Sequence, residues 1–105
     1  MKSTVSTKPE LLKILSENSV RLKSIGVRRL GLFGSVVRGE QQQGSDIDVL
    51  VEFESGQKTF DHFMELSFFL EDLLHRRVDL VTIYSLSPYI GPHILNEVEY
   101  VPLAA

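Results

Sequence analysis

The sequence predicts an α/β (α+β) fold in which a small mixed β-sheet is flanked by helices. Three short apolar runs, at residues 27–33, 47–53 and 78–83, have the length and composition of strands. Helical patterns alternate with them in the order α-β-loop-β-α-β-α, which is typical of a sheet packed against helices. A chain of 105 residues supports one hydrophobic core, so we expect residues 1–105 to form a single domain.

The first helix is expected to begin in the segment TKPE at residues 7–10, after a loose tail at residues 1–7. A polar residue near the cap followed by Pro in the first turn is a helix start signal. Apolar residues follow at helical spacing, with a break near Asn18 and an end at Gly26. These residues are Leu11, Leu12, Ile14, Leu15, Val20, Leu22 and Ile25.

After the first strand, we expect a loop at residues 40–45, a strand at 47–53, a turn at 55–56 and a helix at 60–74. A strand at 78–83, a short helix at 92–97 and a final short strand at 100–103 should follow. The short helix is placed after Gly91 because Pro92 interrupts a helix that begins earlier but fits the first turn of a new one.

The helix expected at residues 60–74 carries more apolar residues than a narrow buried stripe needs. Seven of them form a wide face: Phe60, Phe63, Leu66, Phe69, Leu70, Leu73 and Leu74. Met64 and Phe68 fall outside this face. Surplus apolar surface on a small domain indicates an interface with a partner. A helix packed between the sheet and another helix would have the same composition, and the sequence is compatible with both interpretations.

Composition argues against several classes of protein. The net charge is −3, and because nucleic-acid-binding domains are usually basic, a nucleic-acid partner is not expected. The chain has no cysteine, which excludes disulfides and thiolate metal sites. Its N-terminal residues lack the apolar core of a signal peptide, and no apolar run approaches the roughly 20 residues of a membrane span. These features predict a cytoplasmic protein without a membrane partner.

Two aspartates, Asp46 and Asp48, open the second strand with a single residue between them. Side chains alternate along a strand, so both carboxylates share one face while Ile47 and Val49 point to the other face, toward the core. Two close carboxylates repel each other unless a cation or solvent intervenes. Mg²⁺ favours such oxygen ligands and keeps positions open for substrate phosphates. For this pair alone, a solvated strand end is the alternative interpretation.

The end of the first strand offers groups that suit a phosphate. Gly34 lets a phosphate approach the backbone, and the hydroxyl of Ser35 can bind it, especially if a helix starts here. Arg38 follows three residues later and can pair with phosphate oxygens. Each of these residues alone is compatible with an ordinary loop. The combined pattern of Gly-Ser, ten further residues and Asp-x-Asp is far more specific than its parts.

A third acid, Asp79, lies inside the third apolar strand, with its apolar neighbours on the opposite face. It could complete a cluster of three carboxylates with the two aspartates of the second strand. The structural alternative is an ion pair with Arg76 or Arg77, which are close in sequence.

The segments GLFGSVVRGE, SDIDVLVEF and RRVDLVT resemble, in order and spacing, the sequence blocks of the nucleotidyltransferase superfamily of the DNA polymerase β type. The likeness covers roughly residues 10–100 and is greatest to the minimal nucleotidyltransferase (MNT) proteins. It implies a polymerase β-like nucleotidyltransferase fold with a nucleotide site and a metal site. By resemblance, the nucleotide-binding residues are Gly34, Ser35 and Arg38, and the catalytic residues that bind metal are Asp46, Asp48 and Asp79.

The resemblance also implies an activity, its cofactors and a partner. The implied reaction is transfer of AMP from ATP with release of pyrophosphate, assisted by two Mg²⁺ ions. MNT proteins are similar in organisation to the antitoxin of pairs whose toxin is a helical HEPN ribonuclease. This similarity implies AMP transfer to a tyrosine of that toxin and a hetero-oligomer with it. The alternatives are an antitoxin that neutralises by binding alone and a nucleotidyltransferase that modifies a small molecule.

Overall fold

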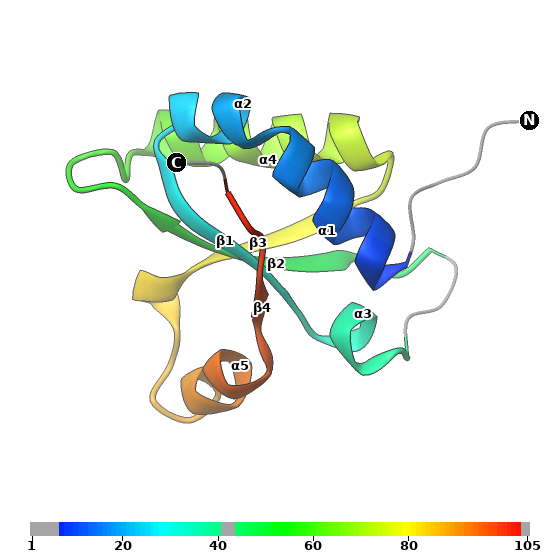
Figure 1. Cartoon of the computed structure of the whole chain (residues 1–105). Coiled ribbons are helices and arrows are strands. Elements are labelled where there is room, and N and C mark those ends of the chain that lie inside the picture. Colours follow the sequence, from blue (N-terminus) through cyan, green and yellow to red (C-terminus); the bar gives the residue numbers. More distant parts are fainter. Residues whose placement is uncertain (1–6, 41–43, 104–105) are drawn as a thin grey trace, which may run out of the picture.

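A computed structural model of the chain describes residues 7–40 and 44–103. Its elements are α1 (Lys8–Glu17), α2 (Ser19–Ser24), β1 (Val27–Phe33), α3 (Ser35–Arg38), β2 (Ile47–Phe53), α4 (Phe60–Leu74), β3 (Val78–Thr82), the 3₁₀ turn η1 (Ile83–Ser85), α5 (Gly91–Glu97) and β4 (Glu99–Tyr100), as drawn in Figure 1. The strands form one sheet in the order β3-β2-β1-β4. β1 runs antiparallel to β2 and β4, whereas β2 and β3 are parallel. This mixed sheet with helices confirms the predicted fold class.

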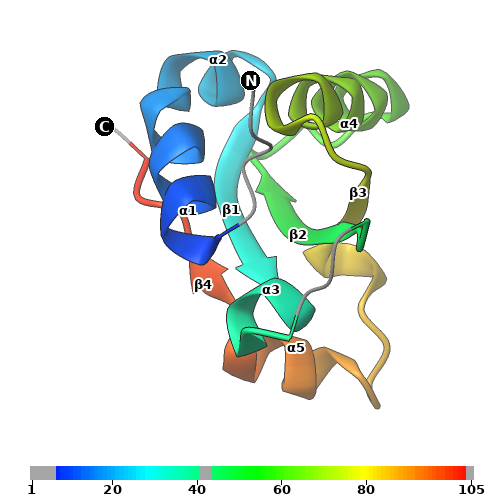
Figure 2. The ribbon, with the colours of Figure 1, turned by 90° about the vertical axis from the view of Figure 1, so that its right-hand side faces the viewer.

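The sheet lies between two unequal layers of helices (Figures 1 and 2). α1, α2 and α4 lie over one face, and α5 lies on the opposite side. Because successive side chains of β2 point to opposite faces of the sheet, this strand contributes to the packing on both faces. Ile47 and Val49 are fully buried in the large cluster beneath α1, α2 and α4. Leu50 points the other way and packs with Phe33 of β1 and Ile94 of α5.

The start of α1 follows the sequence signal closely. Thr7 is the N-cap, and it forms a capping box with Glu10, in which each side chain accepts a hydrogen bond from the backbone N–H of the other. The expected break is at Asn18, which separates α1 from α2. Val20, expected at helical spacing with the other apolar residues, does not share their buried side, because it is 83% exposed. Leu22, two residues on, faces the core, and residues two apart lie on nearly opposite sides of a helix.

Most predicted bounds are confirmed, and the differences occur near the end of the chain. The structure gives β1, β2 and α4 the predicted bounds, whereas β3 ends one residue early, at Thr82, and α5 begins one residue early. The last strand was expected at residues 100–103 but comprises only Glu99–Tyr100. Pro102 has no N–H group to extend the ladder with β1, so the pairing ends there. Residues 1–6 of the predicted tail and 41–43 of the predicted loop lie outside the described residues.

α4 has one buried stripe and exposed aromatic residues on its other sides. Leu66, Leu70 and Leu74 are fully buried against the sheet. Phe60, expected in the wide apolar face, is 76% exposed in the first turn, and Phe68, expected outside it, is 63% exposed. The helix therefore contributes both to the core and to the apolar surface. In the part of the chain that the structure describes, no helix has the length and apolar character needed to cross a membrane.

Two substitutions in α4 separate its buried stripe from its exposed surface. Leu70→Ala is expected to lower the free energy of unfolding by about 2–5 kcal/mol, because it removes buried methyl groups and leaves a cavity. Phe68→Ala is expected to lower it by less than about 1 kcal/mol, because most of that ring is in solvent. Urea denaturation of both variants measures the difference. Equal losses would contradict the assignment of the stripe.

Candidate functional site

The sheet brings two of the three predicted acids into direct register. Asp48 of β2 and Asp79 of β3 are partners in the parallel ladder, so their side chains lie on the same face of the sheet. Asp46 precedes β2 and has a half-exposed side chain. Ile47 and Val49 are fully buried on the opposite face, as predicted. The second strand thus keeps its core contacts while presenting its acids away from the main core.

The carboxyl group of Asp48 is in an unfavourable environment for a negative charge. Partial burial, followed by the charges of Asp79 and Asp46, raises its pKa to about 6. The charge of Glu97 adds to this increase in the pKa, and only Arg38 opposes it. This excess of negative charge, presented by oxygen donors, suits a hard divalent cation.

The three acids are neighbours, but they are not gathered into a finished metal site. No group of three or more Asp, Glu or His side chains within residues 7–40 and 44–103 is already arranged to hold a metal ion. Mutual repulsion keeps unpaired carboxylates apart until a cation neutralises them. The roles of Asp46, Asp48 and Asp79 as metal ligands therefore stay predictions. They are supported by the position of these acids on the face of the sheet away from the main core and by their negative charge.

The alternative for Asp79, an ion pair with a nearby arginine, is not what the structure contains. Arg76 donates a hydrogen bond to the carbonyl of Ser45, and Arg77 lies 3.9 Å from a carboxylate oxygen of Asp46. Within the described ranges, neither arginine forms an ion pair with Asp79. The side chain of Asp79 is exposed, so it is open to a ligand from solvent.

Gly34 brings the end of β1 against the acids. Phe33, the last residue of β1, is the ladder partner of Asp48, and Gly34 follows with a φ of +77°, in the region that favours glycine. A Cβ atom added to Gly34 would overlap the Oδ2 atom of Asp48. Glycine is therefore required by both its backbone conformation and this close approach. Ser35 begins the single helical turn α3, so the condition named for phosphate binding, a helix that starts here, is met.

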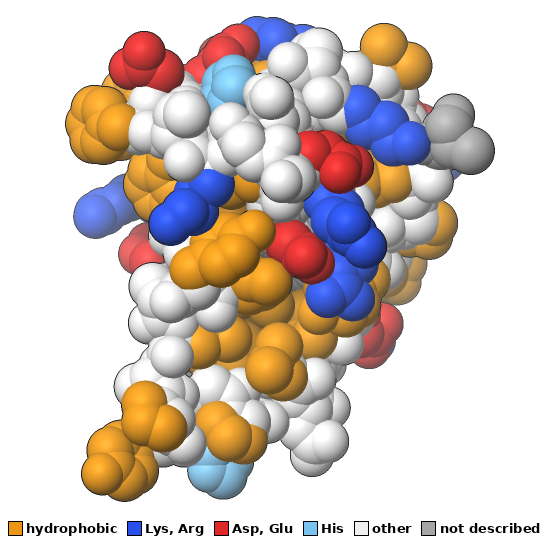
Figure 3. Space-filling model, turned by 90° about the vertical axis from the view of Figure 1, so that its left-hand side faces the viewer, with side chains coloured by type: hydrophobic (Ala, Val, Ile, Leu, Met, Phe, Trp, Pro, Cys, Tyr) orange, Lys and Arg blue, Asp and Glu red, His pale blue; other side chains and the backbone are white. Residues whose placement is uncertain are grey.

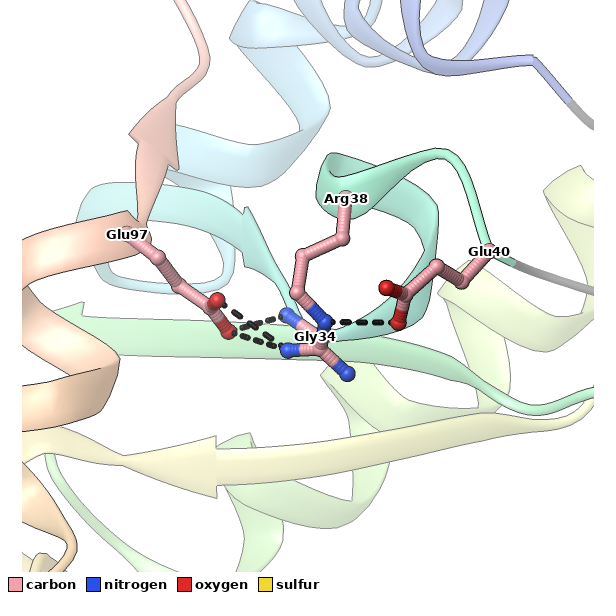
Figure 4. A network of polar contacts seen from close by, with 4 residues as sticks. All are labelled: Gly34, Arg38, Glu40 and Glu97. Atoms are coloured by element: carbon pink, nitrogen blue, oxygen red, sulfur yellow. Dashed lines mark hydrogen bonds and ion pairs between the residues drawn. The ribbon is translucent and has the colours of Figure 1, made fainter.

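Arg38 and Gly34 share one carboxylate, which belongs to Glu97 at the end of α5 (Figure 4). Arg38 Nη1 donates to both carboxylate oxygens of Glu97, at 3.1 and 3.2 Å. The backbone N–H of Gly34 donates to Glu97 Oε2 at 2.7 Å. Arg38 Nε donates to Glu40 at 2.9 Å. Two of the three predicted phosphate-binding residues therefore converge on one anion.

Glu97 is the residue of this site that sequence reasoning missed. It lies 59 residues from Arg38, and its local sequence does not distinguish it from Glu99, which instead pairs with Lys8. Only the fold of α5 against the sheet brings it to the end of β1. A pocket of about 500 Å³, lined by residues of β1, α3 and α5, opens beside Gly34 and Arg38. The arrangement can therefore receive an anion next to a set of carboxylates.

Asp48→Asn is expected to stabilise the protein at neutral pH in the absence of divalent cations. Because the pKa of Asp48 is raised by folding, its ionisation disfavours the folded state. This penalty is absent below pH about 4, grows as the pH rises to about 6 and is complete above it. At pH 7 the variant should gain about 1 kcal/mol in the free energy of unfolding, a value reduced for the solvent exposure of the carboxyl.

Thermal or urea unfolding in EDTA at several pH values measures this effect. Wild type and Asp48→Asn should converge near pH 4 and diverge as the pH rises. A variant less stable than wild type at pH 7 would contradict the described environment of the carboxyl.

Comparison with known proteins gives a consistent result. The family described as nucleotidyltransferase domain matches residues 8–101. Protein adenylyltransferase MntA of Thermococcus cleftensis is 45% identical over 96 residues, covering 90% of this chain and 96% of the relative. A solved structure of a candidate minimal nucleotidyltransferase shares 38% identity with a TM-score of 0.69, over 88% of this chain and 95% of that chain.

A more distant likeness concerns the fold alone. A chain in the solved complex of a tri-AMPylated HEPN toxin of Shewanella oneidensis with its MNT antitoxin is 20% identical, with a TM-score of 0.61. The alignment covers 89% of this chain and 73% of that chain. The family match and the MntA relative each span nearly the whole sequence, and they confirm the family indicated by the three sequence blocks. This chain belongs to the nucleotidyltransferase domain family.

Proposed function

We propose that this chain is an antitoxin that transfers AMP from ATP to a tyrosine of a partner HEPN toxin and thereby neutralises it. The observation that carries the proposal is the contact between Gly34 and Asp48. It sets the predicted phosphate-binding end of β1 against the predicted metal-binding acids of β2 and β3. A triphosphate held at Gly34 would have its reacting phosphorus next to those acids.

In this proposal, the end of β1 holds and orients the nucleotide. The backbone of Gly34, the hydroxyl of Ser35 and the guanidinium of Arg38 bind the triphosphate of ATP. Arg38 is half exposed, so its guanidinium is accessible to a ligand. Binding in a fixed orientation converts the encounter of two substrates into an effectively unimolecular step.

The acids supply the remaining chemistry. Asp46, Asp48 and Asp79 would hold Mg²⁺, expected as two ions, and their negative charge and oxygen donors fit that cation. When bound, Mg²⁺ supplies charge neutralisation and activation of the attacking hydroxyl. The tyrosine oxygen bonds to the α-phosphorus as the bond to pyrophosphate breaks. Asp79, which is exposed and paired with neither arginine, can accept the proton that the tyrosine loses.

The assignment of a protein acceptor draws on the relatives and on the surface. The Thermococcus relative is named a protein adenylyltransferase, and the Shewanella complex contains an AMPylated HEPN toxin. In this chain, hydrophobic side chains gather over the lower part of the face shown in Figure 3, where α5 lies. Tyr89, Ile90 and Leu95, on and just before α5, are 87%, 56% and 51% exposed. Such a surface favours a protein partner over a small molecule.

Intact-mass spectrometry of the toxin tests this function. The purified chain is incubated with the HEPN protein of its own operon, ATP and Mg²⁺. The toxin is expected to gain the mass of one or more adenylyl groups, and EDTA should prevent the gain. A toxin variant with Phe in place of the modified tyrosine should remain unmodified. An unmodified wild-type toxin under all conditions would contradict the proposal.

A second candidate is an antitoxin that neutralises by binding alone. It is favoured by two observations: the exposed aromatic residues Tyr89 and Phe60, and the absence, among the described residues, of a ready set of metal ligands. The two candidates differ in one outcome. Under binding alone, an Asp46→Ala, Asp48→Ala double variant would neutralise the toxin as well as wild type.

A further inference from the structure

The phosphate-binding groups of the site already hold an anion of the chain itself. One oxygen of Glu97 accepts from both the N–H of Gly34, at 2.7 Å, and Arg38 Nη1, at 3.2 Å. The other oxygen accepts from the same Nη1 at 3.1 Å (Figure 4). Hydrogen bonds to an ionised partner are the stronger kind. A carboxylate therefore lies where an oxygen of a phosphate would make the same contacts.

The charge around this contact disfavours a second anion while Glu97 remains in place. Glu40 already takes Arg38 Nε at 2.9 Å, so one guanidinium faces two carboxylates. Asp48 adds a third negative charge next to Gly34. A triphosphate that approached this arrangement without moving any group would meet more negative than positive charge.

The surroundings allow Glu97 to move aside. Its side chain is 26% exposed and that of Arg38 is 49% exposed, so both lie at the rim of the site. The pocket of about 500 Å³ adjoins both residues, which gives a phosphate access to them. Glu97 is the last residue of α5, where rotation of one side chain need not disturb the buried Ile94 of that helix.

We propose that Glu97 limits the affinity of the site for nucleotide by competing with phosphate for the Gly34 N–H and the Arg38 guanidinium. The inference rests on the proposed function in one respect, namely that these two groups bind the triphosphate of ATP. Nucleotide binding then requires the Glu97 carboxylate to leave the groups that it occupies. Glu97 acts through Gly34 and Arg38, and it takes no part in the chemical step.

The competing explanation is that Glu97 is a brace that holds Arg38 in position for phosphate. The two explanations predict opposite signs for one substitution. Glu97→Gln keeps the size and one acceptor oxygen of the side chain but removes its charge. Nucleotide affinity rises if Glu97 competes with phosphate and falls if it positions Arg38.

Calorimetric titration with ATP and Mg²⁺, and separately with inorganic tripolyphosphate, shows whether Glu97→Gln raises or lowers the affinity. We expect Glu97→Gln to bind both ligands about tenfold more tightly than wild type, which corresponds to about 1.4 kcal/mol. Glu99→Gln is the matched control, because it makes the same charge change two residues away, in a residue that pairs with Lys8. It should leave both affinities unchanged. Equal or weaker binding by Glu97→Gln would overturn the proposal.

The two ligands separate failure of this inference from failure of the proposed function. Tighter tripolyphosphate binding by Glu97→Gln, with no ATP binding by either protein, would support competition at the anion site and count against the proposed enzyme. ATP binding by wild type that Glu97→Gln does not strengthen would leave the enzyme in place and reject competition. Circular dichroism and thermal unfolding confirm that each variant is folded.

Discussion

The Asp46→Ala, Asp48→Ala double variant is expected to lose AMP transfer to the toxin by more than about a thousandfold, the range seen when charge-stabilising groups are removed from active sites. The reason is that both residues are proposed to hold the cation that neutralises the triphosphate. The loss should not arise from unfolding, since Asp46 is half exposed and the charge of Asp48 disfavours the folded state. Single-turnover labelling of the toxin measures the rate.

The matched control for this variant is Asp72→Ala. Asp72 is an exposed carboxylate of α4, so its removal changes the charge of the protein without touching the candidate site. It should label the toxin at the wild-type rate. A loss of less than about a hundredfold in the double variant would contradict the roles proposed for the two acids.

The second large effect is expected from a single added methyl group. Gly34→Ala should reduce AMP transfer by at least about a hundredfold, because small displacements of reacting groups have effects of this size. The new Cβ atom would overlap the Asp48 carboxylate, which forces the end of β1 and the acid apart. The backbone of Gly34, with a φ of +77° and a ψ of −149°, is also in a region essentially restricted to glycine, so alanine costs about 1–3 kcal/mol of stability there. Transfer rates and urea unfolding measure the two effects.

Gly39→Ala is the control for a positive φ without a close approach. Gly39 has a φ of +72° and a ψ of 22°, in the left-handed helical region, whereas the ψ of Gly34 is −149°, and a Cβ atom at Gly39 would meet nothing within 4 Å. It should therefore lose less stability than Gly34→Ala and retain most of the transfer rate. If both variants lost activity equally, contact between Gly34 and Asp48 would not be what the site requires.

Local sequence patterns predicted the helix start and the strand bounds, because these features depend on residues that are close together in the sequence. The capping signal at Thr7 and the apolar runs of β1 and β2 gave correct bounds, and strand alternation placed Asp48 opposite the buried Val49. Errors arose where burial depends on the rest of the molecule. Val20 and Phe60 have the residue types of a core, but both are largely exposed, and Val20 lies on the side of its helix opposite the buried Leu22.

The candidate site was predictable to the extent that its residues lie in recognisable blocks. Gly34 and Asp48 belong to such blocks, and their contact follows from the antiparallel pairing of β1 with β2. Glu97 does not belong to one, because its role depends on a contact between α5 and α3 that no local pattern encodes. The raised pKa of Asp48 likewise depends on burial and on charges from other segments.

The position of the transferred phosphorus distinguishes AMP transfer to a protein partner from other reactions of ATP. Purified chain and its HEPN partner are incubated with Mg²⁺ and ATP that is radiolabelled at either the α- or the γ-phosphate. If this chain transfers AMP to a tyrosine of the partner, we expect label from the α-position on that tyrosine and no label from the γ-position. Label from the γ-position, or none from the α-position, would contradict it.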